Sequence, residues 1–205
     1  MRVLAWPAFR KEAANPPAAL LARELQALGV DIDDWRPLRA LLRPGELWHL
    51  HHPETVLFRR WAPAAWAETL TFLLLWWLAR LRGTRMLWTI HDLGSNDHLH
   101  PRLERMFWSA FVPRVDGFIC LTEGGRRDAL ERFPELAGRP SAVIPHGHYL
   151  DAYPSGIGRG AARAQLGLDP DGPVVLHFGL IRPYKNVPHL VSVFRQAAIP
   201  GAVLV

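Results

Sequence analysis

The chain has 205 residues, of which 49% are hydrophobic and 21% charged, so a globular protein is expected and an intrinsically disordered one is excluded. Its formal net charge is +5, carried by arginines apart from Lys11 and Lys185, which fits anionic partners such as diphosphates or a phospholipid surface. No basic block, zinc-finger spacing or helix-turn-helix pattern occurs, and we expect no nucleic-acid partner.

The single cysteine, Cys120, excludes an intrachain disulfide and favours a reduced, cytosolic setting. It lies in an apolar run, and we expect a buried core side chain rather than a nucleophile. Met1 is followed directly by the strand-like RVLAW, without the charged and apolar regions of a secretory leader. The expected localisation is therefore cytoplasmic.

Strand and helix patterns alternate along the chain, which predicts an α/β protein with a parallel sheet. Apolar β-type runs predict the first six strands at Arg2–Trp6, Val30–Trp35, Glu46–His51, Arg85–His91, Gly117–Leu121 and Ser141–Ile144. Helical spacing and capping residues predict the intervening helices at Asn15–Leu28, Trp61–Leu81, Leu103–Val112 and from Thr122 to about Arg132. Together these elements predict a first Rossmann-like domain over residues 1–148.

The helix Trp61–Leu81 is rich in tryptophan and has an uninterrupted apolar part, Leu70–Ala79. That part would be only ~15 Å long as a helix, against a hydrocarbon core of ~30 Å, so we expect no transmembrane span. A helix buried in a layer that covers the sheet is one interpretation. The other is a surface that also touches lipid, because tryptophan favours membrane interfaces, and it places the protein peripherally on the inner face of the cell membrane.

Glycine-rich sequence follows the sixth strand, and it predicts an interdomain linker over residues 149–170 with a short helix at Ala161–Leu166. Residues 171–205 then begin a second Rossmann-like unit, with strands Val174–Phe178 and Ala202–Val205 around a helix Asn186–Ala197. A single β-α-β piece cannot cover both faces of its sheet. We therefore expect this second domain to be incomplete, as in a fragment of a longer protein.

The loop FGLIRPYKN, Phe178–Asn186, joins the strand to the helix of this second unit. Backbone N–H groups and the helix dipole at such a helix start attract anions. Gly179 permits close approach, and Arg182 and Lys185 could neutralise a pyrophosphate. A basic turn of this kind fits either a bound diphosphate or a solvated surface.

The segment TIHD ends at the carboxyl edge of the predicted sheet, where open α/β folds bind ligands. There His91 could donate a hydrogen bond to a sugar hydroxyl or phosphate, or transfer a proton, and Asp92 could orient it or cap local backbone. The alternative is a histidine that only anchors its loop. His98 and His100 lack a third ligand at a recognisable spacing, and we expect no metal site.

Other polar residues follow neighbouring strands at the same edge. His49 and His51 share one face of their strand, and His51 and His52 lie at its end. Each could contact a sugar or simply satisfy neighbouring polar groups. In VIPHGHY, Pro145 and Gly147 predict a rigid turn that brings His146 and Gly147 near the interdomain cleft. In LTEGGRRD, Thr122 predicts a helix cap, with an anion site at its N–H groups as the less favoured alternative.

The segments TIHD, LTEGGRRD, IPHGHY and FGLIRPYKN, in this order, resemble the bacterial retaining glycosyltransferases of family 4, which have the GT-B fold. The similarity is strongest to the branch with IPHG-x-Y followed by FG-x-IRPYKN, many of whose members act in polysaccharide or glycolipid assembly. No Walker A loop, Ser-His-Asp order or zinc signature competes with this resemblance.

The resemblance implies a hexosyltransferase that moves a sugar from a GDP- or UDP-sugar to a lipid-linked or polysaccharide acceptor with retention and without an obligatory metal or other cofactor. Gly179, Arg182 and Lys185 would then hold the donor diphosphate on the C-terminal domain. His91 would meet the transferred sugar or its phosphate as the catalytic histidine, and the acceptor would bind the N-terminal domain. His51, His52, Asp92, Thr122, His146 and Gly147 would line the sugar and acceptor cleft.

The chain departs from the family pattern in two places. The loop after the first strand, PAFRKEAANPP, lacks the paired glycines often found near the donor, although Arg10, Lys11 and Asn15 offer side chains. The acidic pair expected late in the C-terminal domain would lie beyond Val205, so we expect these 205 residues alone to transfer no sugar. Two alternatives are a sugar-nucleotide epimerase of the same fold and a non-catalytic module that docks on membranes.

Overall fold

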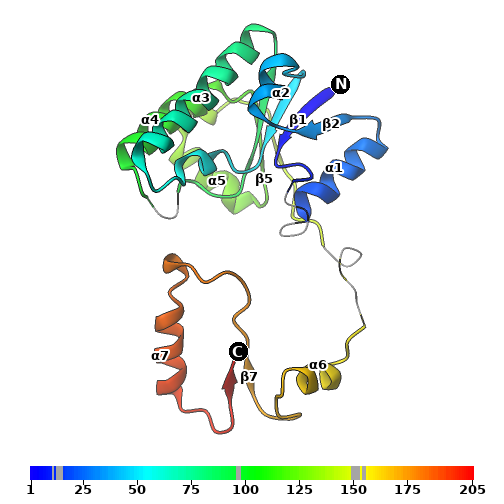
Figure 1. Ribbon diagram of the computed structural model, residues 1–205, viewed down its shortest axis with the longest axis vertical. Helices are drawn as coiled ribbons and strands as arrows, with labels where there is room; N and C mark the ends of the chain where they lie inside the picture. The colour runs from blue at the N-terminus through cyan, green and yellow to red at the C-terminus, as the bar shows by residue number, and fades with distance from the viewer. Residues whose placement is uncertain (11, 13–15, 96–97, 149–152, 154–155) are drawn as a thin grey trace. The chain divides into compact units, whose positions relative to one another are not determined.

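The computed structural model describes residues 1–205 except 11, 13–15, 96–97, 149–152 and 154–155 (Figure 1). By its internal contacts the chain divides into two compact units, Met1–Tyr149 and Leu150–Val205. The predicted caps or contacts of Lys11 and Asn15 lie outside the described residues.

The first unit is built on a six-stranded sheet in which all neighbouring strands are parallel. Its strand order is β2-β1-β3-β4-β5-β6. The strands are β1 (Arg2–Trp6), β2 (Asp31–Asp34), β3 (Leu47–Leu50), β4 (Arg85–Ile90), β5 (Gly117–Cys120) and β6 (Ser141–Val143). The helices are α1 (Pro17–Ala27), α2 (Pro37–Leu42), α3 (Ala62–Leu81), α4 (Pro101–Phe111) and α5 (Glu123–Arg132), with single 3-10 turns at Pro53–Leu57, Val112–Arg114 and Pro134–Leu136.

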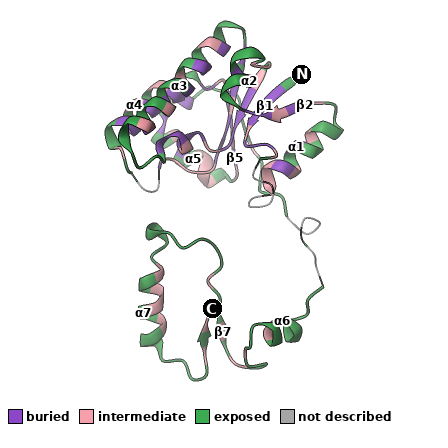
Figure 2. Ribbon diagram, in the orientation of Figure 1, coloured by how far each residue is buried: buried purple, intermediate pink, exposed green. Residues whose placement is uncertain are grey.

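The two faces of this sheet are covered unequally. One face carries the large core, in which residues of β3, β4 and β5 pack against α2, α3, α4 and α5 (Figure 2). Its largest side chains are aromatic, among them Trp48, Trp76, Trp88 and Phe107, all at most 1% exposed. The opposite face has a small cluster in which Val3, Ala5 and Ile32 meet Ala22 of α1. The polar residues of β3 and β4 lie on this less covered face.

The predicted elements are found, with shifted ends and one addition. Helix α2 was not predicted: it has only six residues, too few for a helical period to show, and Pro37 begins it. Helix α1 begins at Pro17 with Pro16 at the cap position, one residue later than predicted. Cys120 is 1% exposed, as expected, and burial raises the pKa of its thiol. A buried thiol of this kind is a poor nucleophile.

Helix α3 packs on the sheet, which confirms the interpretation as a covering helix. Thr69, Phe72 and Trp76 are buried, whereas Trp66 and Trp77 are 40% and 53% exposed. Of the tryptophans in this segment, Trp76 is thus part of the core, and the prediction of a surface that also touches lipid applies only to the exposed ones. By length and composition α3 could cross a membrane, and 33% of its apolar window is buried inside the protein.

The second unit contains α6 (Arg159–Gln165), β7 (Val174–Val175), a 3-10 turn at Pro183–Lys185, α7 (Val187–Ala197) and β8 (Val203–Leu204). Strands β7 and β8 are parallel, and both are shorter than predicted. The predicted apolar stripe of α7, which includes Leu190 and Phe194, is only half-buried, and none of the described residues of this unit is fully buried. A lone β-α-β piece exposes its apolar faces in this way.

Candidate functional site

Histidines gather at the carboxyl edge of the sheet in the first unit. Because side chains alternate along a strand, His49 and His51 lie on the same face, and their rings are 4.3 Å apart between centroids. His91 follows β4, and its ring is 5.6 Å from that of His51 and 4.6 Å from that of His52, on which it stacks. His146, after β6, is 5.6 Å from His91. Four of the predicted site residues, His51, His52, His91 and His146, thus form one cluster.

The histidine cluster borders a cavity of about 760 Å³ on the less covered face of the sheet. His51, His91, His146 and Gly147 line its polar end, and apolar residues of the sheet and α1 line the rest. The predicted rigid turn at Pro145 and Gly147 is wrong, because Ile144–His148 forms no turn, and Gly147 has space for a side chain. The histidines are therefore placed by strand ends rather than by a hinge.

Burial keeps the imidazoles of His49, His51 and His91 neutral. It lowers the pKa of His49 to about 4, and the Nε2 of this residue hydrogen-bonds the Thr89 hydroxyl at 2.8 Å. Burial, with repulsion from the neighbouring histidines, lowers the pKa of His51 to about 2. Burial first, then repulsion from His52 and His146, lowers the pKa of His91 to about 4. At neutral pH His49, His51 and His91 thus offer uncharged N–H donors and nitrogen acceptors.

His51 is positioned to orient His91. The Nδ1 of His51 is 3.3 Å from the Nε2 of His91, so one of the two nitrogens donates and the other accepts. The backbone N–H of His51 donates to the carbonyl of Trp6 at 2.9 Å, which ties the end of β3 to the end of β1. A neutral His91 held in this way can donate one hydrogen bond to an oxygen that gains negative charge.

A second group of side chains lies at the edge of the histidine cluster. His52, Glu54 and Asp92 offer three potential ligand atoms within 4.8 Å of one another, a spacing that could hold a metal ion. Two of these three residues bond each other: the Nδ1 of His52 is hydrogen-bonded to Oε1 of the buried Glu54 at 3.1 Å. His98 and His100, the pair considered from the sequence, instead bond Glu104 and the carbonyl of Arg59 separately.

Thr122 is a helix cap, as its sequence context favoured. Its hydroxyl accepts a hydrogen bond from the backbone N–H of Gly125 at 2.9 Å at the start of α5. Glu123, in the first turn, pairs with Arg126 at 3.0 Å. The Thr122 hydroxyl thus satisfies one of the backbone N–H groups at the start of the helix.

The FGLIRPYKN loop lies in the second unit and is solvent-exposed. Gly179 has φ +129°, a conformation that favours glycine, and a side chain there would come within 3.2 Å of the Lys185 ammonium. The Lys185 N–H donates to the Arg182 carbonyl at 3.0 Å, closing the turn before α7. Asn186 occupies the N-cap position of α7, but its side chain makes no hydrogen bond to the helix. The loop thus presents Arg182 and Lys185 just before the first turn of α7.

The stability of the first unit at acidic pH tests whether the buried histidines are neutral in the folded protein. In the unfolded chain these imidazoles bind protons near pH 6.5, whereas His49 in the folded protein resists protonation down to about pH 4. The unfolded state therefore binds more protons between these values, and stability falls as the pH is lowered through this window. For His49 alone we expect a loss of a few kcal/mol, on the order of the pKa difference.

Urea unfolding at pH 7.5, 6 and 5 would measure this loss. The variant His49→Gln should show a weaker pH dependence than the unchanged chain, and His98→Gln, at an exposed ion pair, should follow the unchanged chain. Equal pH dependence in all three proteins would contradict the assignment of His49 as a buried neutral group.

Comparison with known proteins supports an enzyme class. No protein-family model matches the chain. Over 162 residues, 78% of the chain, it is 30% identical to a GDP-mannose:glycolipid 4-beta-D-mannosyltransferase of Xanthomonas campestris pv. campestris and spans 41% of that protein. Over 107 residues, 51% of the chain, it is 30% identical to an alpha-maltose-1-phosphate synthase of Mycobacterium tuberculosis and spans 27% of it. The chain thus spans less than half the length of either relative.

Solved structures show the same fold. The crystal structure of Anabaena Alr3699/HepE in complex with UDP-glucose matches the whole chain with a TM-score of 0.56 and 16% identity, over 59% of its own length. The complex of the same protein with UDP and glucose matches 99% of the chain with a TM-score of 0.59 and 13% identity, over 59% of its length. The expected fold class, α/β of the GT-B type with a Rossmann-like first domain, is confirmed. In sequence the chain is similar to glycosyltransferases.

Proposed function

We propose that the protein to which this chain belongs is a glycosyltransferase that moves a hexosyl group from a GDP- or UDP-sugar to a lipid-linked or polysaccharide acceptor with retention. The observation that carries the proposal is the cluster of histidines around His91, whose own pKa is lowered to about 4, at the carboxyl edge of a GT-B-type sheet. The similarity to a GDP-mannose-dependent transferase favours glycosyl transfer over epimerisation.

In the proposed reaction, the acceptor hydroxyl oxygen bonds to the anomeric carbon as the bond from that carbon to the diphosphate oxygen breaks. The hydroxyl proton leaves with the diphosphate, whose negative charge Arg182 and Lys185 stabilise. His91 donates its N–H to the transferred sugar or its phosphate. We propose no obligatory metal, because two cationic side chains and a helix start supply the charge that the leaving group needs.

We further propose a cytoplasmic protein that lies peripherally on the inner face of the membrane. The outer side of α3 exposes apolar residues at helical spacing, Trp66, Leu70, Leu74, Trp77 and Leu81. Arg60, before the helix, and Arg82 and Arg85, after it, are exposed and have no ion pair among the described residues. Tryptophan between flanking arginines suits an anionic lipid surface.

The donor assignment is tested with the protein extended to the full length of its relatives. Arg182→Ala and Lys185→Ala should each weaken binding of the nucleotide sugar by roughly tenfold or more, because each removes a charge-assisted contact to the diphosphate. Isothermal titration calorimetry would measure the dissociation constants.

The matched control is Arg195→Ala, which removes an exposed arginine from the last turn of α7 and should leave affinity unchanged. Unchanged binding in both loop variants would overturn the diphosphate assignment. The 205-residue chain alone, which spans 41% of the mannosyltransferase relative, should turn over no nucleotide sugar.

A further inference from the structure

A second cavity lies on the opposite face of the sheet from the one that the histidines border. It has a volume of about 750 Å³ and opens between the ends of β1 and β2, the turn before α3 and the first half of α3 itself. None of the residues predicted for the site lines it. Pro7 lines both cavities, so this second cavity, called here the aromatic pocket, is a neighbour of the histidine cluster at the same sheet edge.

The wall of the aromatic pocket is built from residues distant in sequence. Trp6 and Trp35 stack with their ring centroids 4.6 Å apart and their planes 7° apart, and Phe72 lies 5.4 Å from Trp6. Trp35 is 7% exposed, and its indole N–H has no hydrogen-bond partner among the described residues. Phe58, at the mouth, is 45% exposed. Flat aromatic walls of this kind bind prenyl chains or the apolar face of a sugar ring.

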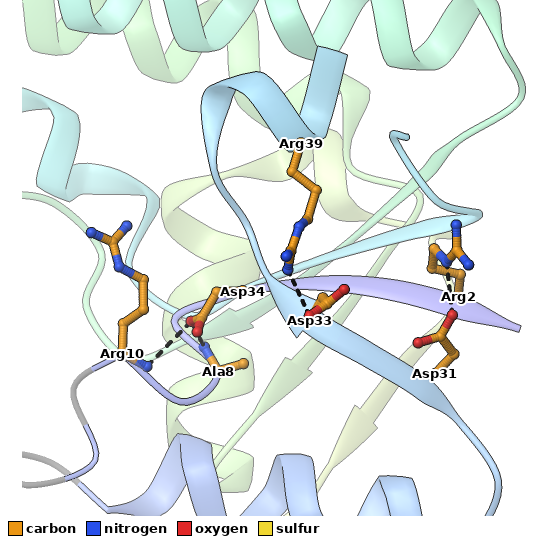
Figure 3. Close-up of polar contacts among 7 residues, drawn as sticks. All are labelled: Arg2, Ala8, Arg10, Asp31, Asp33, Asp34 and Arg39. Atoms are coloured by element: carbon orange, nitrogen blue, oxygen red, sulfur yellow. Dashed lines mark hydrogen bonds and ion pairs between the residues drawn. The ribbon is translucent and has the colours of Figure 1, made fainter. Parts of the chain in front are cut away.

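The rim of the aromatic pocket carries Arg10, whose guanidinium forms no ion pair with the residues that the structure describes. The carboxylate of Asp34 accepts hydrogen bonds from the backbone N–H groups of Ala8 and Arg10, at 3.0 and 3.3 Å, which holds the loop after β1 in place. Figure 3 shows the Arg10 guanidinium turned away from Asp34, and no ion pair to it is found among the described residues. The other arginine at the rim, Arg59, is neutralised by Glu68 at 2.7 Å.

This combination selects a ligand with two chemically different parts. A guanidinium at a cavity mouth favours a phosphate, which it can bind through two parallel hydrogen bonds. The aromatic wall behind it favours an apolar chain. Phe58 at the mouth lies three residues before Trp61, which precedes α3 and is 71% exposed. An amphipathic ligand could therefore enter from an apolar surface.

We propose that the aromatic pocket is the acceptor subsite and that it takes the phosphorylated isoprenoid part of a lipid-linked acceptor, with the phosphate on Arg10 and the chain against Trp6 and Phe58. The role of this ligand as the acceptor rests on the proposed function, whereas its binding to the aromatic pocket does not. Pro7 lines both cavities, and the carbonyl of Trp6 accepts a hydrogen bond from the backbone N–H of His51. The acceptor end would thus lie beside the residues proposed for transfer.

Calorimetric titration of the 205-residue chain with farnesyl phosphate, below its aggregation concentration, tests this assignment without a nucleotide sugar. Saturable binding is expected, and Arg10→Gln should weaken it at least tenfold, to about the affinity of farnesol. Inorganic phosphate should bind at least tenfold more weakly than farnesyl phosphate, which separates a lipid phosphate from a free one. Arg127→Gln, an exposed arginine on α5, is the matched control and should bind like the unchanged chain.

A second variant fills the pocket. Ala67 lines it from an exposed position on α3, so Ala67→Trp should preserve the fold, checked by circular dichroism, while abolishing binding of both farnesyl phosphate and farnesol. Unchanged affinity in Arg10→Gln or in Ala67→Trp, or equal affinity for inorganic phosphate, would overturn the proposal. Arg182→Ala should leave farnesyl phosphate binding intact, so a failure here is distinct from a failure of the donor assignment.

Discussion

Replacing Trp76 with alanine is expected to lower the free energy of unfolding by about 3–5 kcal/mol, as is typical when a large aromatic side chain is removed from a core. Trp76 is 1% exposed and packs on Trp48 with ring centroids 5.3 Å apart. Its neighbour Trp77 is 53% exposed, so Trp77→Ala should change stability by less than about 0.5 kcal/mol. Urea unfolding of the two variants provides a comparison at adjacent positions.

Trp76→Phe refines this prediction. The indole N–H of Trp76 has no hydrogen-bond partner among the described residues, so phenylalanine retains most of the packing and removes an unpaired donor. The cost should be well below that of alanine. For vesicle binding, the more important of the two positions should be Trp77. In co-sedimentation with anionic vesicles, Trp77→Ala should lose binding and Trp76→Phe should keep it. Equal vesicle binding by Trp77→Ala and the unchanged protein would contradict membrane contact through α3.

His91→Ala in the full-length protein is expected to lower kcat by roughly 10²–10³-fold, within the range for a positioned proton-donating or hydrogen-bonding group. The donor dissociation constant should change much less, because Arg182 and Lys185 are untouched. His98→Ala, which removes a histidine outside the cluster, should leave kcat unchanged. Steady-state kinetics with calorimetric donor affinities would separate the two effects.

His91→Gln distinguishes the two roles open to this histidine. Because the pKa of His91 is lowered to about 4, a neutral N–H donor is expected, and the glutamine amide should restore part of the activity by donating in its place. A proton carrier could not be replaced in this way. Full activity of His91→Ala would show that the cluster has only a structural role.

Several parts of the candidate site could be predicted from local sequence. His91 was expected at the carboxyl end of a strand, because an apolar β-type run ends directly before it, and Thr122 was expected to cap a helix. The shared face of His49 and His51 followed from strand alternation and is confirmed by their ring contact. These features depend on residues within a few positions of one another, where backbone geometry dictates the outcome.

The aromatic pocket could not be predicted from local sequence in the same way. Trp6, Trp35 and Phe72 come from β1, the end of β2 and α3, and nothing in their spacing indicates that they meet. Arg10 was noted as an available side chain, but its role depends on Asp34 fixing its backbone from another strand. One sequence signal does exist. Trp6 ends β1 and Trp35 directly follows β2, and the parallel pairing of these two strands brings both tryptophans to the same edge of the sheet.

By itself, the sequence determined the alternation of strands and helices, the parallel sheet, and the histidines and basic loop at strand ends, since these follow from local periodicity and capping. Only the tertiary structure decided which tryptophan of α3 is buried, because Phe72–Ala79 is apolar on all sides and has no polar face to orient it. It also decided the depressed pKa values of His51 and His91, which arise from burial and mutual repulsion among side chains brought together by strand order.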